Sequence, residues 1–110
     1  MLADSGYDVW MNNNRGNRFS KHHAYYDPGV HEEYWDFSFQ EFAQYDQPAL
    51  FDFVLGRTGQ TSVTYIGHSQ GTMQMFAALI ENGEFFQNKI NLCMMLAPVT
   101  RVKNLAATVL

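Results

Sequence analysis

Apolar residues gather in two short runs separated by a stretch with helical spacing. Residues 62–67 form a β-branched run, and residues 90–99 form a second apolar run that is stopped by Pro98. Between them, small and apolar residues recur at helical spacing over 71–80, and an Asn-Gly pair at 82–83 closes that stretch. This pattern predicts a buried strand, a helix and a second buried strand.

A longer helical pattern precedes the first run. Over residues 32–55, apolar side chains recur at spacings of three and four. Pro48 predicts either a kink in this helix or the start of a second helical segment with Asp46 near its cap. Gly56 and Gly59 are expected to end the helix.

The first thirty residues read as a strand followed by a long irregular segment. Residues 7–11 alternate and are rich in strand formers, whereas the Asn- and Gly-rich residues 12–17 predict a loop. Residues 18–31 are expected to be irregular and exposed, with a turn at 27–29. Strands alternating with helices predict an α/β fold with a parallel sheet, and continuous apolar strands favour a sheet covered on both faces.

Composition narrows the classes of protein that fit. A chain of 110 residues is sufficient for one small domain, and 46% hydrophobic with 16% charged residues excludes a disordered, collagen-like or coiled-coil chain. A net charge of −4 argues against a nucleic-acid binder. The single Cys93 permits no internal disulfide and is expected to be an inert core residue. We predict no metal and no other cofactor, because metal-ligand spacing and a Gly-rich nucleotide loop are both missing from the sequence.

The pentapeptide Gly67-His68-Ser69-Gln70-Gly71 matches the pattern G-x-S-x-G. It lies directly between the predicted strand and the predicted helix, which is the context of a nucleophile elbow. We expect the sharp turn to hold Ser69 in a strained backbone at the carboxyl edge of the sheet, and both glycines to prevent collisions with the neighbouring strand and helix. The backbone N–H of Gln70 is the predicted oxyanion donor.

A catalytic serine also needs a base and an acid that orients it, and the sequence supplies neither in the usual order. No histidine follows Ser69. His68 is its neighbour, but consecutive side chains diverge on such a turn, so we expect it to pack beneath the elbow or to line the pocket. The remaining candidates lie in segments expected to be solvent-exposed: His22, His23 and His31, and Glu81 and Glu84.

Several segments together carry a family resemblance. They are residues 2–10, Asn13 with 15–17, 35–39, 45–46 with 48–49, 65–72 and 96–99. In combination they resemble the acid lipase family of α/β-hydrolases, the group of lysosomal acid lipase and gastric lipase. Asn12 departs from the pattern, since the family usually has glycine there, although asparagine can adopt a left-handed backbone.

The resemblance implies hydrolysis of fatty-acyl esters, such as triacylglycerols or sterol esters, through an acyl-enzyme on Ser69 with Gln70 as oxyanion donor. The implied partners are a lipid ester substrate and, in the complete protein, a lipid interface; nucleic acid is not implied and no protein partner is identified. The implied location is lysosomal or secreted, and the N-terminal residues of this chain show no signal-peptide pattern.

Measured against this family, residues 1–110 are expected to be a partial α/β-hydrolase (lipase) domain. The N-terminal strands with the second oxyanion donor, and the C-terminal portion with the lid and the triad Asp and His, would lie outside it. The family's sheet order also implies that only the strands at 63–66 and 92–96 can pair. We therefore expect the isolated chain to have negligible esterase activity. Two alternatives are a non-catalytic lipid-binding or interaction fragment, and a lipase-derived relic that does not fold alone.

Overall fold

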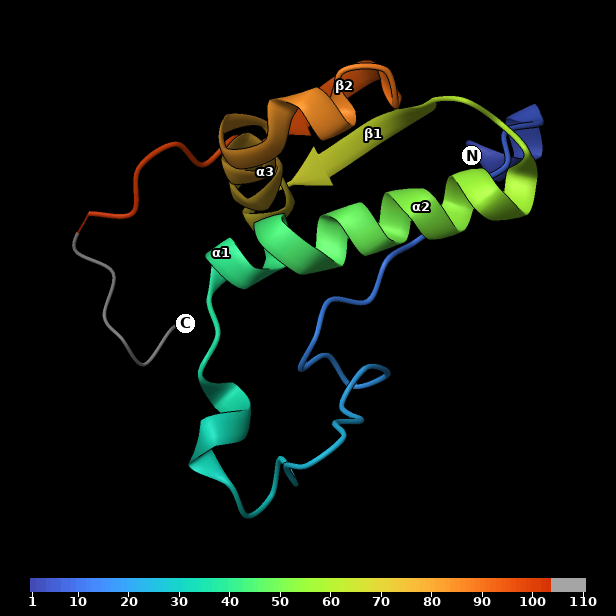
Figure 1. Ribbon diagram of the computed structural model, residues 1–110. Coiled ribbons are helices and arrows are strands. Elements are labelled where there is room, and N and C mark those ends of the chain that lie inside the picture. The colour runs from blue at the N-terminus through green and yellow to red at the C-terminus, as the bar shows by residue number, and fades with distance from the viewer. Residues whose placement is uncertain (104–110) are drawn as a thin grey trace.

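The computed structural model describes residues 1–103 (Figure 1). These residues form two strands, three α-helices, two short 3₁₀-helices and one π-helical turn. A long irregular segment precedes most of these elements in the chain. In chain order the elements are the 3₁₀-helices η1 (Ala3–Ser5) and η2 (Glu32–Trp35), α1 (Phe39–Glu41), the π-helical turn η3 (Phe42–Asp46), α2 (Gln47–Thr58), β1 (Val63–His68), α3 (Gln70–Phe86) and β2 (Ile90–Leu96).

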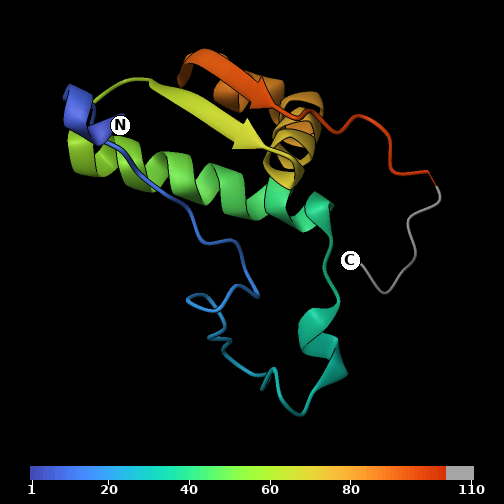
Figure 2. The same cartoon turned by 180° about the vertical axis from the view of Figure 1, so that it is seen from behind.

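Strands β1 and β2 form a parallel two-stranded sheet, with α3 as the connection between them (Figure 2). The register pairs Val63 with Ile90 and His68 with Leu96, with one irregularity just after Val63. A strand, a crossover helix and a parallel strand form the basic unit of an α/β fold. The predicted fold class is therefore confirmed, and within residues 1–103 these are the only two strands that pair, as predicted.

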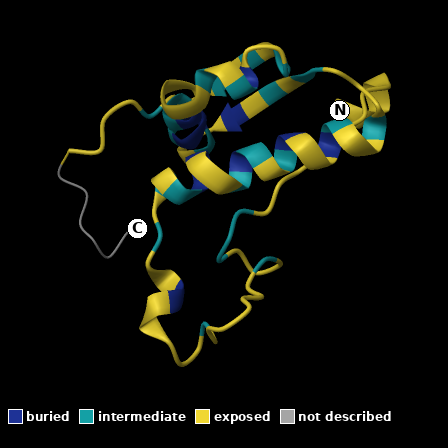
Figure 3. Ribbon diagram, viewed as in Figure 1, coloured by how far each residue is buried: buried dark blue, intermediate teal, exposed yellow. Residues whose placement is uncertain are grey.

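One face of this sheet packs against the helices and forms the core. The buried cluster consists of residues from η3, α2 and α3: Ala43, Phe51, Met75, Ala78 and Phe86. From the strands, Val63, Tyr65, Ile90, Cys93 and Met95 pack against it. Phe51 links the layers, because its ring stands edge-on to Phe86 and is stacked on Tyr65. Figure 3 shows the same concentration of buried residues where α2, α3 and β1 meet.

The opposite face of the sheet, called the bare face below, is exposed within the described residues. Ile66 on β1 and Leu92, Met94 and Leu96 on β2 retain between 38% and 53% of their possible exposure. The expectation of strands covered on both faces is thus wrong for residues 1–103. The composition of the strands fits a sheet covered on both faces, but the helices described here cover only one.

The helical stretch begins with a capping box at Ser38. The Ser38 N–H donates to the Glu41 carboxylate, and the Ser38 hydroxyl accepts from Gln40 N–H. Pro48 lies in the first turn of α2, directly after η3. The backbone is already helical at Asp46 and Gln47, so Pro48 does not start a separate helical segment. Asp46 stands at the cap position, but its side chain makes no capping bond.

Helix α2 ends at a single glycine. Gly59 adopts a left-handed backbone with φ 68° and donates its N–H to the Leu55 carbonyl, as expected for a C-cap. Gly56 was also expected to end the helix, and that expectation is wrong. It lies inside α2, because one glycine weakens a helix by only about 1 kcal/mol.

The predicted strand at residues 7–11 is not a strand in the structure. These residues lie outside every helix and strand, and Tyr7 and Met11 are largely exposed. No strand pairs with them, and an extended segment without a partner has no ladder of hydrogen bonds. Residues 12–31 are irregular and mostly exposed, as predicted.

Helix α3 consists of two helical segments that meet at a kink at Asn82, whose φ of −141° and ψ of 48° are not helical. The first segment therefore closes at the predicted Asn-Gly pair, and a second segment continues to Phe86. One further boundary differs from the sequence prediction. Strand β2 ends at Leu96, before Pro98, because Ala97 already turns the chain with a positive φ of 48°. Within the described residues, no helix is both long enough and apolar enough to cross a membrane.

Candidate active site

Ser69 lies at the tight turn between the end of β1 and the start of α3. Its φ of 51° and ψ of −112° place it in a backbone conformation that residues other than glycine rarely adopt. Such strain persists only where the surrounding structure fixes it, and it is typical of functional turns. The predicted strained turn is confirmed in its geometry, and the Ser69 residue is exposed.

The turn is tight because β1 and α3 approach closely at Gly67. A Cβ atom at Gly67 would lie 2.9 Å from the backbone of Gly71 and 2.8 Å from the ring of Tyr65. These distances are shorter than real Cβ contacts, so Gly67 is required, as predicted. A Cβ at Gly71 would meet only ordinary contacts at 3.6 Å and beyond, so the predicted collision there is wrong. The sequence did not show that the atoms nearest to a Cβ at Gly71 are the ends of the Tyr65 and Gln74 side chains rather than backbone.

Tyr65 joins the strand to the first turn of the helix. Its hydroxyl donates a hydrogen bond of 2.8 Å to the Gly71 carbonyl. Burial raises the pKa of Tyr65 to about 12, so the phenol stays protonated and can donate at neutral pH. This contact holds the start of α3 against β1, just beyond Ser69.

Two further contacts hold the backbone of Ser69 itself. Its N–H donates to the Leu96 carbonyl at 3.0 Å, at the end of β2. Its carbonyl accepts from both the N–H and the hydroxyl of Thr72, at 2.9 and 2.6 Å. Thr72 is fully buried, and its hydroxyl also accepts from the Val99 N–H at 2.9 Å. The elbow is therefore attached to the segment that follows β2.

Gln70 is the first residue of α3. The first N–H groups of a helix have no partner within it. No acceptor within residues 1–103 takes the Gln70 N–H, so the group is available to an oxyanion. The helix N-terminus also favours negative charge at this point.

The elbow borders a wide hollow that is lined by the N-terminal segment, by α2 and by residues from both faces of β1. His68, Gln70, Ile66 and Met94 contribute to its lining. Its volume, about 2040 Å³, exceeds the range of roughly 300–1,000 Å³ that is typical of small-molecule pockets. The hollow is therefore an uncovered surface rather than a fitted substrate pocket.

The structure brings no base to Ser69 within residues 1–103. His68 is exposed and lines the hollow, which is one of the two placements expected for it; it does not pack beneath the elbow. No histidine or carboxylate in this range is hydrogen-bonded to the Ser69 hydroxyl. The other candidates are exposed as expected: His22, His23 and His31, and Glu81 and Glu84. Figure 1 draws the loop that carries the three histidines well away from the elbow.

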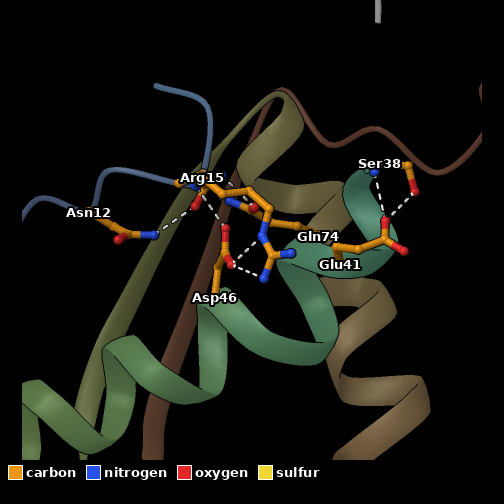
Figure 4. A network of polar contacts seen from close by, with 7 residues as sticks. Asn12, Arg15, Ser38, Glu41, Asp46 and Gln74 are labelled. Atoms are coloured by element: carbon orange, nitrogen blue, oxygen red, sulfur yellow. Dashed lines mark hydrogen bonds and ion pairs between the residues drawn. The ribbon is translucent and has the colours of Figure 1, made fainter. Parts of the chain in front are cut away.

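A polar network ties the irregular N-terminal segment to the helices beside the elbow (Figure 4). Asn14 donates from its amide to the side chain of Gln74 on α3 at 2.8 Å. Arg15 donates from its backbone N–H and from Nε to the Asp46 carboxylate, at 2.9 and 2.8 Å. The Asp46 carboxylate is thereby bound to Arg15, while the Asp46 backbone is helical, with φ −68° and ψ −43°, and leaves no helix start to cap.

At the far end of this network, Glu41 completes the capping box. The backbone N–H of Ser38 donates to its carboxylate and lowers the pKa of Glu41 below its usual value. Glu41 therefore stabilises the start of α1 in its ionised form. It serves the helix and is not a candidate for acid–base chemistry at Ser69.

Sequence reasoning missed the residues that support the elbow. Thr72 and Tyr65 were expected only as members of a helix and a strand, and their hydroxyls gave no signal of a partner. Positive φ at Ala97 was not expected either, because alanine rarely adopts it. No group of three His, Cys, Asp or Glu side chains within residues 1–103 could hold a metal ion.

Comparison with known proteins places this geometry in a family. A family model described as the alpha/beta hydrolase fold matches residues 1–108. A tear acid lipase-like protein of Mesocricetus auratus is 45% identical over 99% of this chain, which covers 27% of that protein. Gastric triacylglycerol lipase of Bos taurus is 48% identical over 94% of the chain and 25% of its own length. A probable lipase of Schizosaccharomyces pombe is 48% identical over 94% of the chain and 22% of its length.

The chain thus spans about a quarter of the length of the relatives it matches. The match is nevertheless spread over nearly all of this chain, and it includes the strand, the elbow and the helix described above. These relatives carry lipase names, and the resemblance to acid lipases that the motifs indicated is confirmed. The chain belongs to the α/β-hydrolase fold family.

Proposed function

We propose that this chain is the nucleophile-bearing part of a serine ester hydrolase of the acid lipase type. The observation that carries the proposal is the backbone of Ser69, held at φ 51° and ψ −112° between β1 and α3. Strain of this kind at a serine is the mark of a nucleophile elbow. The proposed substrate is a fatty-acyl ester. The name of gastric triacylglycerol lipase supports a triacylglycerol, and a sterol ester follows from the resemblance to the acid lipase family.

In the proposed reaction, the Ser69 hydroxyl attacks the ester carbonyl carbon while a base takes its proton. The carbonyl oxygen becomes an oxyanion that accepts a hydrogen bond from the Gln70 N–H. The alcohol leaves with that proton, and an acyl-enzyme remains on Ser69. Water then attacks the acyl group and releases the fatty acid.

The base and the acid that orients it are proposed to lie outside residues 1–110, in a longer protein that also supplies the second oxyanion donor and a lid. The 110 residues would be a partial α/β-hydrolase domain. The coding sequence on either side should then encode an upstream His-Gly loop and a downstream Asp and His. Unrelated sequence on both sides would contradict this proposal. A lysosomal or secreted location belongs to the same proposal.

Labelling with a fluorophosphonate probe tests the proposed nucleophile. In the longer protein we expect mass spectrometry to find the adduct on Ser69, and Ser69→Ala to abolish it. Ser62→Ala is the matched control, because Ser62 lies just before β1 and outside the elbow. A folded longer protein that takes no label at Ser69 would refute the nucleophile.

The isolated 110-residue chain provides the second arm of this test. Because no base reaches Ser69 within the described residues, we expect it to hydrolyse p-nitrophenyl butyrate no faster than its Ser69→Ala variant does. Turnover comparable to that of a complete lipase would show that the chain contains a base of its own.

The alternative function is non-catalytic binding of lipid. The exposed apolar side chains Ile66, Leu92, Met94 and Leu96 on the bare face favour it, since they offer a surface for acyl chains. Under this alternative, vesicle binding by the folded chain is unchanged in Ser69→Ala and no adduct forms on Ser69. An adduct on Ser69 would count against it.

A further inference from the structure

We infer that Thr72 is a positioning residue for the nucleophile, and that its hydroxyl transmits the position of the segment after β2 to Ser69. This inference rests on the proposed function, because the position of Ser69 matters for chemistry only if its hydroxyl attacks the substrate. Thr72 does not contact the reacting atoms. It acts on the backbone that carries them.

The first step of the argument is the hydrogen-bonding capacity of the hydroxyl. Thr72 Oγ1 donates its one proton to the Ser69 carbonyl at 2.6 Å and accepts the Val99 N–H at 2.9 Å. A hydroxyl has one donor and can accept, so both functions are used in defined directions. The side chain has no exposed surface, and water is therefore not in contact to replace either bond.

The second step is the position of these bonds around Ser69. Its N–H is bound by the Leu96 carbonyl, and its own carbonyl is bound by Thr72. Leu96 and Val99 stand on either side of the turn at Ala97, whose φ is 48°. The end of β2 thus holds the Ser69 N–H directly through Leu96, and the segment after β2 holds the Ser69 carbonyl indirectly through Thr72.

The third step is strain. A serine at φ 51° and an alanine at φ 48° are each in a strained backbone conformation. Such conformations persist only where surrounding contacts fix them. The Thr72 hydroxyl joins the two segments that contain these residues, through the Ser69 carbonyl and the Val99 N–H. Without the hydroxyl, Ser69 keeps its bonds to the Leu96 carbonyl and the Thr72 N–H but loses the link to Val99, so both turns are held less firmly.

Hydrogen exchange of backbone amides in the 110-residue chain tests this inference. The variant Thr72→Val keeps the shape of the side chain and removes both hydrogen bonds. We expect exchange at the Ser69 and Val99 amides to accelerate by about tenfold, the change that loss of one buried hydrogen bond brings. The Gly59 amide, bonded to the Leu55 carbonyl at the far end of α2, serves as the internal reference and should keep its rate.

The variant Thr72→Ser separates positioning from general packing. It keeps the hydroxyl and removes a methyl group, so protection at Ser69 and Val99 should return to the level of the parent. Equal acceleration at all amides in Thr72→Val, no change at Ser69 and Val99, or no rescue by serine would each overturn the inference. So would a parent chain in which the Val99 amide is unprotected.

This measurement is independent of the proposed hydrolysis. Exchange needs no base at Ser69 and no substrate, whereas probe labelling needs an activated serine. If exchange at the elbow depends on Thr72 but the longer protein takes no label at Ser69, the proposed hydrolase is refuted. The hydrogen bonds of Thr72 then remain as a purely structural element. Labelling in the longer protein with no effect of Thr72→Val on exchange would retain the hydrolase and refute the positioning role.

Discussion

The two faces of the β1–β2 sheet have similar apolar compositions and opposite surroundings. On one face, Tyr65 and Cys93 lie under α2 and α3, next to the fully enclosed Met75. On the other, Leu92 and Leu96 are each 53% exposed. A strand alternates its side chains between the faces, so each strand contributes to both. The comparison teaches that the sequence of a strand encodes two surfaces, of which the described residues bury one.

The largest expected difference between the faces is in packing. Phe51→Ala should lower the free energy of unfolding by about 3–5 kcal/mol, since it removes a ring that is 2% exposed and contacts Tyr65 and Phe86. Leu92→Ala on the bare face should change it by no more than about 0.5 kcal/mol. Urea unfolding of both variants measures the two values. Equal losses would mean that the bare face is covered in solution.

A smaller effect is expected where the covered face meets the elbow. Gly67→Ala should cost about 1–3 kcal/mol, because the added methyl would lie 2.9 Å from the Gly71 backbone. Gly56→Ala is the matched control: it lies within α2 with open space around it and should stabilise by about 0.5–1 kcal/mol. Thermal unfolding compares the two. A Gly67→Ala variant as stable as the parent would show that β1 and α3 can separate at the elbow.

The smallest effect concerns the buried phenol of Tyr65. At neutral pH, Tyr65→Phe should cost about 0.5–1.5 kcal/mol through the lost bond to the Gly71 carbonyl. Above pH 10 the unfolded chain releases the phenolic proton, whereas the folded chain retains it up to about 12. The unfolded state is then favoured, so the stability that Tyr65 contributes is present below pH 10 and is lost as pH rises through 12.

Urea titrations of the parent and Tyr65→Phe between pH 8 and 12 measure this effect. The difference in stability between the two proteins should shrink as pH rises. A constant difference would show that the phenol of Tyr65 titrates alike in the folded and unfolded chains, and so is less enclosed than its contacts indicate.

The elements that sequence predicted correctly are those whose contacts lie close along the chain. The β-branched run before Gly67, the helix after Gln70 and the cap at Gly59 each depend on neighbours within a few residues. The turn at Ser69 followed from the same local order. Its conformation was predictable because a strand that leads directly into a helix leaves few backbone paths.

The errors arose where a distant partner decides the outcome. Residues 7–11 have the composition of a strand, but a strand exists only with a neighbour to share its hydrogen bonds. Asp46 has the chemistry of a cap, but it lies inside a continuous helical stretch, and its carboxylate binds Arg15, 31 positions away. Thr72 resembles any small helix residue until Val99, 27 positions on, donates to it. Periodicity carries no information on such pairs.

The π-helical turn η3 affects which side chains of α2 face the core, because α2 follows it without a break. Each residue in an α-helix advances the side chains by about 100°, and a turn with i→i+5 bonds inserts one residue more than a regular turn does. Phe42 and Ala43 lie at the start of η3, Phe51 and Val54 lie beyond it, and all four are buried. Deleting one residue from η3 would turn Phe51 by about 100° relative to the residues before η3, and so away from Tyr65 and Phe86. The length of η3 is thus part of what places Phe51 in the core.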